Sequence, residues 1–189
     1  MSKSTLLKVE KQEIFINMEQ EIFKGNLLDI GNDNYGIIYS LYKQYNADNN
    51  LDYIYGREKK KKIEQEFYDN CVMLFSLSSI WTKYNKKHMF KEINKYLKED
   101  GTIHIWDIDK GYGKLFNAKI KILLPNRKIK TIEIKDYNIL KDTSKENLIK
   151  LLQHYFEIID LRASDNIYYI KGRKKGRNKD ESIIDGSKL

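Results

Sequence analysis

The sequence predicts an α/β fold with a mostly parallel sheet that is closed by an antiparallel hairpin strand. Between residues 26 and 107, strand-like apolar runs alternate with helical patterns, which is typical of right-handed crossovers between parallel strands. The unbroken apolar run Cys71-Val72-Met73-Leu74-Phe75 suits a central strand covered on both faces. Two strand-like segments near the carboxyl terminus, 155–161 and 166–172, flank a turn and predict the closing hairpin.

The composition is that of one globular domain. The chain has 189 residues, 41% hydrophobic and 33% charged, which is enough to bury a sizeable core. Its formal net charge of +8 permits an anionic partner such as RNA. The single Cys71 excludes an intramolecular disulfide and a cysteine-rich zinc site. Because no apolar run could span a bilayer and no secretory hydrophobic core follows the N-terminus, we expect a cytoplasmic protein.

The first half of the chain supplies the elements of the parallel sheet. An apolar stripe predicts an N-terminal helix over residues 5–24, which ends at Gly25. The next segments are a strand at 26–30, a helix to about residue 45, and strands at 51–55 and 68–77. A loop or short helix at 76–84, an amphipathic helix at 85–98 and a strand at 102–106 complete this half.

The second half breaks this rhythm. Residues 118–124 and 128–134 alternate apolar and polar side chains around Pro125, which predicts a β-hairpin with one wet face. Thr143 is expected to cap the next helix, with Glu146 as its capping-box partner. We expect one domain over residues 1–172 and a basic, polar, disordered tail over 173–189.

The segment Asn26–Gly36 is the first candidate site. Its sequence, Asn-Leu-Leu-Asp-Ile-Gly-Asn-Asp-Asn-Tyr-Gly, gives a short strand with an acidic residue, Asp29, and then a loop bounded by Gly31 and Gly36. A strand, a glycine loop and a helix form the arrangement that receives a nucleotide-like ligand in α/β sheets. An ordinary strand-to-helix turn has the same pattern, so both interpretations stay open at this point.

The order of these segments resembles the class I S-adenosylmethionine-dependent methyltransferases over roughly residues 27–171. That family has a mostly parallel sheet that closes with an antiparallel hairpin strand. The resemblance rests on three stretches, which are similar to the family's first motif, its fourth-strand motif and its helix-plus-fifth-strand segment: Leu28–Gly36, Tyr68–Leu77 and Met89–Asp107. Two features depart from the family pattern. First, Asp33 and Tyr35 stand where the family usually has its second and third glycines, unless Gly36 takes the place of the third through a one-residue insertion. Second, the family's third strand has little room between residues 58 and 68. We expect that edge strand to be missing.

The resemblance implies S-adenosyl-L-methionine as cofactor. In the family, the first-motif acid lies near the methionine part, which would be the role of Asp29. Glu58 would accept hydrogen bonds from the ribose hydroxyls, for which an ionised carboxylate is suited. The alternatives are a carboxylate that caps the next helix for Asp29 and a surface side chain for Glu58. The expected cofactor-binding residues are Asp29, Gly31, Asn32, Asp33, Gly36, Glu58, Ser76 and Leu77.

The acceptor site is expected at the ends of the fourth and fifth strands of the family pattern. We predict that Trp81, Asp107 and Tyr112 contact the substrate and that the 118–134 hairpin covers it. Trp81 as a core residue, and Asp107 and Asp109 as loop caps, are the alternatives. His104 is expected to be a packed histidine. Because the histidines have no partners at metal-ligand spacing, we predict no metal site.

The sequence supports three functional hypotheses. The first is a methyltransferase with a small-molecule acceptor, since residues 76–80 lack the Asn/Asp-Pro-Pro-aromatic signature of nucleic-acid amino methylation. The cofactor would carry the intrinsic reactivity and the protein would align the reactants, with no catalytic residue named. The second is a catalytically inactive binding or scaffold protein of the same fold. The third is RNA binding through Lys59–Lys62 and the basic tail, with few aromatic residues to support it.

Overall fold

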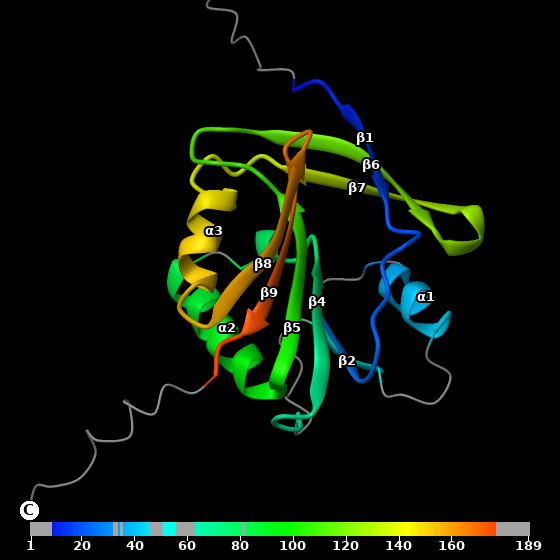
Figure 1. The fold of residues 1–189 in the computed structure, drawn as a ribbon. Helices are drawn as coiled ribbons and strands as arrows, with labels where there is room; N and C mark the ends of the chain where they lie inside the picture. The colour runs from blue at the N-terminus through cyan, green and yellow to red at the C-terminus, as the bar shows by residue number, and fades with distance from the viewer. Residues whose placement is uncertain are drawn as a thin grey trace, which may run out of the picture.

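The computed structural model describes residues 9–31, 34, 36–45, 51–55, 63–80 and 82–176. Its elements form two β-sheets and three α-helices in the described part of the chain (Figure 1). None of the described helices has both the length and the apolar character that a membrane crossing requires.

The larger sheet has six strands in the order β3-β2-β4-β5-β9-β8. They are β2 (Leu27–Gly31), β3 (Leu51–Tyr55), β4 (Tyr68–Leu74), β5 (Leu97–Ile108), β8 (Phe156–Ser164) and β9 (Ile167–Lys174). Strands β3, β2, β4 and β5 are parallel neighbours, whereas β9 pairs antiparallel with both β5 and β8. The predicted parallel sheet with an antiparallel closing hairpin is therefore confirmed. In the described part of the chain, β3 forms one edge of this sheet. The expected absence of the third strand stays a prediction, because residues 56–62 lie outside the described residues.

Side chains along the central strands alternate between the two faces of the larger sheet. Cys71, Met73 and Ile105 lie in the core that packs against α2 (Lys83–Tyr96) and α3 (Lys145–Leu152). Val72, Leu74 and Trp106 lie in the core on the opposite face, with α1 (Ile37–Lys43). Figure 1 shows α2 and α3 together on one side of the sheet and α1 on the other. The unbroken apolar run of β4 reflects this double covering.

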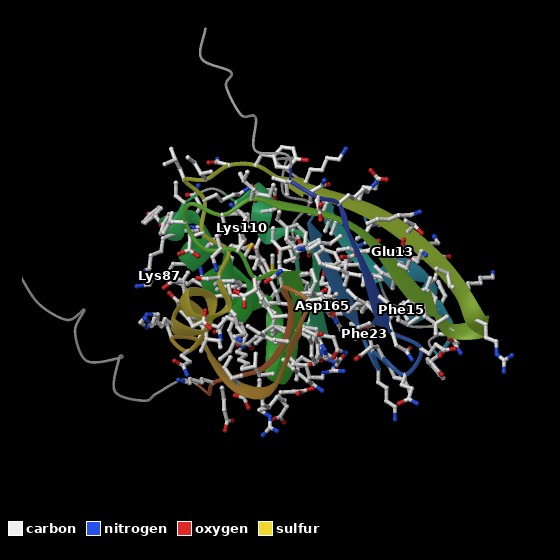
Figure 2. All side chains as sticks on the ribbon, turned by 90° about the horizontal axis from the view of Figure 1, so that it is seen from above. Glu13, Phe15, Phe23, Lys87, Lys110 and Asp165 are labelled. Atoms are coloured by element: carbon white, nitrogen blue, oxygen red, sulfur yellow. The ribbon has the colours of Figure 1, made fainter. Side chains whose placement is uncertain are left out.

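A second, three-stranded sheet completes the core on the α1 face. It contains β1 (Gln12–Asn17), β6 (Phe116–Leu124) and β7 (Lys128–Asp136) in the order β1-β6-β7. The predicted hairpin is confirmed, because β6 and β7 are antiparallel and joined by the 3₁₀ turn Pro125–Arg127. Alternate β6 residues are buried, which leaves the polar face toward solvent. Figure 2 shows Glu13 and Phe15 on β1 beside this hairpin.

The predicted N-terminal helix is wrong in its described part. Residues 12–17 form β1, which pairs in parallel with β6, and residues 18–26 form no regular helix. Ile14-Phe15-Ile16 is a β-branched and aromatic run, and these residue types favour a pleated strand. Ile14 is buried while Phe15 is 57% exposed, so the side chains alternate with a period of two. The apolar residues of this segment have helix-like spacing by chance, and pairing with β6 decides its conformation.

The start of α3 also differs from the prediction. The N-cap is Ser144, and its side chain makes no capping hydrogen bond. Thr143 Oγ1 instead donates to the carbonyl of Lys110 at 3.4 Å. The carboxylates at the start of α3 are those of Asp142 and Asp109, and not that of Glu146. Asp142 accepts from the Ser144 N–H, and Asp109 accepts from the Lys145 N–H.

A buried lysine fixes the two loops that lead to α3. Lys110 is only 1% exposed, and its ammonium donates to the carbonyls of Asn138 at 2.7 Å and Lys141 at 3.1 Å. Asp136 lies 3.5 Å away and balances the charge. Figure 2 shows Lys110 within the molecule. These bonds hold the loop after β5 against the loop after β7, and both loops border a cavity at the strand ends.

Candidate functional site

The larger sheet has a topological switch point between β2 and β4. From β2 the chain moves to β3 on one side, and β4 then lies on the other side of β2. Crevices at the carboxyl ends of such strands are where open α/β sheets bind ligands. The backbone ladder between β2 and β4 ends at Asp29 and Val72, and beyond it the Ser76 side chain connects the two strand ends. The candidate site is built from residues at these strand ends and in the loops that leave them.

Asp29 is a buried acid near the end of β2. Its side chain is 5% exposed, and Oδ2 accepts a 2.7 Å hydrogen bond from Asn34 Nδ2. Burial raises the pKa of Asp29 to about 7, and the Asn34 hydrogen bond opposes this rise. Buried acids with a raised pKa are common at functional sites. A cationic ligand would bind the ionised form of Asp29 and favour it.

Gly31 and Ser76 join the ends of β2 and β4 in close contact. Gly31 has φ +143°, and a Cβ on this residue would lie 2.2 Å from Ser76 Cβ. Ser76 Oγ donates to the Ile30 carbonyl at 3.0 Å. Only glycine fits this conformation and this approach, because the Ser76 side chain fills the space that a Cβ on residue 31 would need.

Asp107, at the end of β5, holds the residue after Ser76 in place. Its Oδ2 accepts from the Leu77 N–H and its Oδ1 from the Ile108 N–H, both at 2.8 Å. The side chain is 1% exposed. Burial raises the pKa of Asp107 to about 6, while the two N–H groups and the Lys86 ammonium oppose the rise. This geometry favours a positioning role for Asp107, and its predicted substrate contact stays a prediction.

At pH 8 we expect Asp107→Asn to gain less stability than Asp29→Asn, by about 1–3 kcal/mol. Both substitutions remove a buried charge, but the new amide at position 107 can accept only one of the two N–H groups with its oxygen. The other N–H then faces a donor in a buried site. Urea unfolding of both variants at pH 8 would measure the difference, and equal gains would show that the two hydrogen bonds contribute little.

A cavity of about 150 Å³ opens on the α2 and α3 face of the same strand ends. Leu77 and Tyr112, two of the predicted site residues, line it together. The cavity lies between the first turns of α2 and α3 and the two loops that Lys110 joins. The hairpin that was expected to cover the acceptor packs in the core of the opposite face. Its Lys130 Nζ lies 3.7 Å from where a Cβ on Gly36 would be.

The structure brings most described members of the predicted site to one edge of the sheet. Asp29, Gly31, Ser76, Leu77 and Asp107 lie at the ends of β2, β4 and β5. Gly36 stands at the N-cap of α1 with φ 68°. Four further predictions fall outside the described residues: Asn32, Asp33, Glu58 and Trp81.

Three polar residues of this region were missed by the sequence analysis. Asn34 binds Asp29, and Lys86 and Tyr168 line the cavity. Asn34 lies inside the quoted first motif, so its amide five residues after an acid was an available signal. Lys86 and Tyr168 carry no local signal, because a lysine in a helix and a tyrosine in a strand are ordinary.

His104 was expected to be a packed histidine, and the structure confirms this: the side chain is buried and does not lie at the strand ends. It is 3% exposed, and its ring nitrogens lie 2.9 Å from Thr102 Oγ1 and from Tyr169 Oη. Burial lowers the pKa of His104 to about 3, so the ring is neutral at pH 7. In the part of the chain that the structure describes, no group of three His, Cys, Asp or Glu side chains could hold a metal ion.

Several solved structures that superpose on this chain are methyltransferases. The chain superposes on an S-adenosylmethionine-dependent methyltransferase from Mesorhizobium loti with a TM-score of 0.50 and 9% identity, over 83% of this chain and 94% of that one. It superposes on the 1,6-didemethyltoxoflavin-N1-methyltransferase of Burkholderia thailandensis, solved with bound 1,6-didemethyltoxoflavin and S-adenosylhomocysteine. The TM-score is 0.52 and the identity 11%, over 82% of this chain and 72% of that one. No family model matches the sequence, and no curated protein matches it. The fold is therefore the Rossmann-like methyltransferase fold, as the sequence predicted.

Proposed function

We propose that this protein is an S-adenosylmethionine-dependent methyltransferase with a small-molecule acceptor. The observation that carries the proposal is the buried Asp29, with a pKa of about 7, at the switch point of a methyltransferase fold, where Gly31 and Ser76 bring the ends of β2 and β4 together. The Burkholderia neighbour, which was solved with a small-molecule acceptor, supports the choice of acceptor class.

The residues present fit this cofactor. S-adenosylmethionine has an ammonium and a sulfonium group and no phosphate, so a buried carboxylate is a suitable partner. In the sequence of the loop after β2, Asp33 would repel the pyrophosphate of a dinucleotide, which argues against a nicotinamide cofactor. Gly31 lets the Ser76 side chain pack directly on the end of β2, which fixes the strand ends beside Asp29. The bound cofactor would supply an electrophilic methyl group.

The chain's own residues would bind and orient. Asp29 would hold the cationic methionine part, with Asn34 fixing the rotation of its carboxylate. Ser76 and Leu77 would form the wall between cofactor and acceptor, and Asp107 would keep Leu77 in place through its N–H. We assign Glu58 to the ribose hydroxyls and Asn32, Asp33 and Gly36 to the cofactor loop. Alignment of the two reactants is the main contribution that such a site makes to the rate.

Calorimetric titration with S-adenosylmethionine and S-adenosylhomocysteine tests the proposal. We expect micromolar binding by the wild type and a loss of about 10- to 100-fold in Asp29→Asn, since a hydrogen bond to a charged group is worth about 1.5–3 kcal/mol. Asp100→Asn is the matched control, because Asp100 is exposed near the amino-terminal end of β5. No binding by the folded wild type would refute the proposal and favour an inactive scaffold. The RNA alternative depends partly on Lys59–Lys62, which lie outside the described residues.

Cofactor affinity should rise with pH. Because the pKa of Asp29 is about 7, the acid is largely protonated at pH 6 and ionised at pH 8. A cation binds the ionised form, so affinity should fall about tenfold for each pH unit below 7. We expect roughly tenfold weaker S-adenosylhomocysteine binding at pH 6 than at pH 8 in the wild type, and little change with pH in Asp29→Asn. Equal wild-type affinities at the two pH values would contradict the role given to Asp29.

A further inference from the structure

The cavity beside Leu77 contains a buried hydroxyl without a partner. Tyr168 is 0% exposed and lines the cavity from β9. Its hydroxyl has no hydrogen-bond partner among the described residues. Leaving a buried polar group unpaired is destabilising, and such groups in native proteins call for an explanation. A ligand that accepts or donates a hydrogen bond at this point would remove the cost.

A partly satisfied ammonium lies in the same cavity wall. Lys86 is 6% exposed, and its Nζ donates to the carbonyl of Asp142 at 2.8 Å. An ammonium has three donors, so two of them have no partner within the described residues. Burial lowers the pKa of Lys86, whereas Asp107 and Asp142 oppose this. Lys83, one turn earlier on α2, adds a second cation to the cavity lining.

The nearby acids are already engaged. Asp142 accepts from the Ser144 N–H at 2.8 Å and from the side-chain amide of Asn147. Asp107 accepts from two backbone N–H groups. Neither carboxylate forms an ion pair with Lys86 within 4.0 Å in the described structure. The free donors of Lys86 are therefore available to an anionic group in the cavity.

The amino terminus of α3 also borders the cavity. Ser144 and Asn147 are lining residues, and the Ser144 side chain makes no capping bond. The N–H groups of Ser144 and Lys145 are bound by Asp142 and Asp109. The N–H groups of Glu146 and Asn147, in the same first turn, have no partner inside the helix, and the helix dipole favours negative charge there. This feature adds to the unpaired Tyr168 hydroxyl and the Lys86 ammonium, and all three suit an anionic oxygen.

The mouth of the cavity is apolar. Tyr112 and Leu140 line it and are 70% and 72% exposed. A volume of about 150 Å³ is below the range of roughly 300–1,000 Å³ for drug-sized ligands. A head group therefore fits inside, and a larger apolar body would lie against these two side chains.

The cavity adjoins the proposed cofactor site through two consecutive residues. The Ser76 side chain contacts Gly31 and donates to the Ile30 carbonyl. The next residue, Leu77, lines the cavity, and its N–H is fixed by Asp107. A ligand in the cavity and a cofactor at Gly31 would lie on the two sides of this dipeptide.

We propose that this cavity binds the methyl acceptor, and that the acceptor is a small molecule with a carboxylate or phosphate head and an apolar body. The assignment as acceptor site rests on the proposed function. The anionic head contacts Lys86, Tyr168 and the first turn of α3, and the body covers Tyr112 and Leu140.

Calorimetry with model ligands tests this inference. The probes are benzoate and phenyl phosphate, with benzyl alcohol as the neutral control, each titrated with and without saturating S-adenosylhomocysteine. We expect the anions to bind and benzyl alcohol to bind at least tenfold more weakly. Lys86→Met should weaken anion binding at least about tenfold and Tyr168→Phe several-fold. Lys87→Met is the matched control, because Lys87 is exposed on α2 and lies at the outer edge of the molecule in Figure 2.

The outcomes separate this inference from the proposed function. Binding of S-adenosylhomocysteine without any anion binding would overturn the inference and leave the methyltransferase proposal intact. Anion binding that Lys86→Met and Tyr168→Phe do not change would also overturn it, because the ligand would then bind elsewhere. Anion binding without S-adenosylhomocysteine affinity would keep the ligand site but remove its role as acceptor site. Tyr168→Phe removes only an unpaired hydroxyl, so this variant is expected to fold.

Discussion

Asp29→Asn should stabilise the folded protein at pH 8 while it weakens cofactor binding. Asp29 is 5% exposed, and burial raises its pKa from 3.8 to about 7. The folded state therefore binds a proton that the unfolded chain has lost between pH 4 and pH 7, and the wild type loses stability over this window. Asparagine has no charge to bury, and its oxygen can still accept from Asn34. We expect a gain of about 1–3 kcal/mol in the free energy of unfolding.

The pH profile distinguishes this effect from a general change in packing. The gain of Asp29→Asn over the wild type should be smallest near pH 4 and complete above pH 7, and urea unfolding across this range would measure it. Asp100→Asn should show no such profile, since Asp100 is exposed. A constant difference between the two proteins at all pH values would argue against titration of Asp29. At functional sites, residues that are needed for ligand binding often lower the stability of the folded protein.

The sheet could be predicted because its signals are local. The apolar run at Cys71–Phe75 marks a strand covered on both faces, and the alternation over β6 and β7 marks a hairpin with one wet face. The N-terminal segment was assigned wrongly because its structure depends on a distant partner. Ile14 pairs with Ile120, more than a hundred residues away, and spacing alone does not reveal this pairing.

The candidate site also has one part that the sequence could predict and one part that it could not. Asp29, Gly31 and Ser76 lie at strand ends, and the carboxyl ends of parallel strands meet at one edge, so their proximity could be expected. The cavity could not be predicted, because its lining comes from α2, β9 and the loops around Lys110. Only tertiary packing brings these segments together. The unpaired hydroxyl of Tyr168 has meaning only once its surroundings are known.

Gly31→Ala should cost the fold about 3–5 kcal/mol. A non-glycine residue at φ +143° is strained by about 1–3 kcal/mol. The new Cβ would also lie 2.2 Å from Ser76 Cβ and 2.4 Å from its Oγ, so the ends of β2 and β4 must move apart. Ser76→Gly removes both of these atoms and leaves the Ser76 Cα at 3.6 Å, an ordinary contact. That variant alone should lose about 1–2 kcal/mol, since the hydrogen bond to Ile30 disappears and the chain gains a glycine.

The double variant Gly31→Ala/Ser76→Gly should therefore be more stable than the sum of the two single losses, by at least about 1 kcal/mol. Urea unfolding of all four proteins gives this coupling energy. Gly111→Ala is the matched control, because a Cβ at Gly111 would meet nothing within 4 Å, and this change should be close to neutral. Additive losses would mean that the strand ends do not touch as tightly as the structure shows. A coupled pair would establish that a close contact between two strand ends, and not loop sequence alone, shapes the floor of the cofactor site.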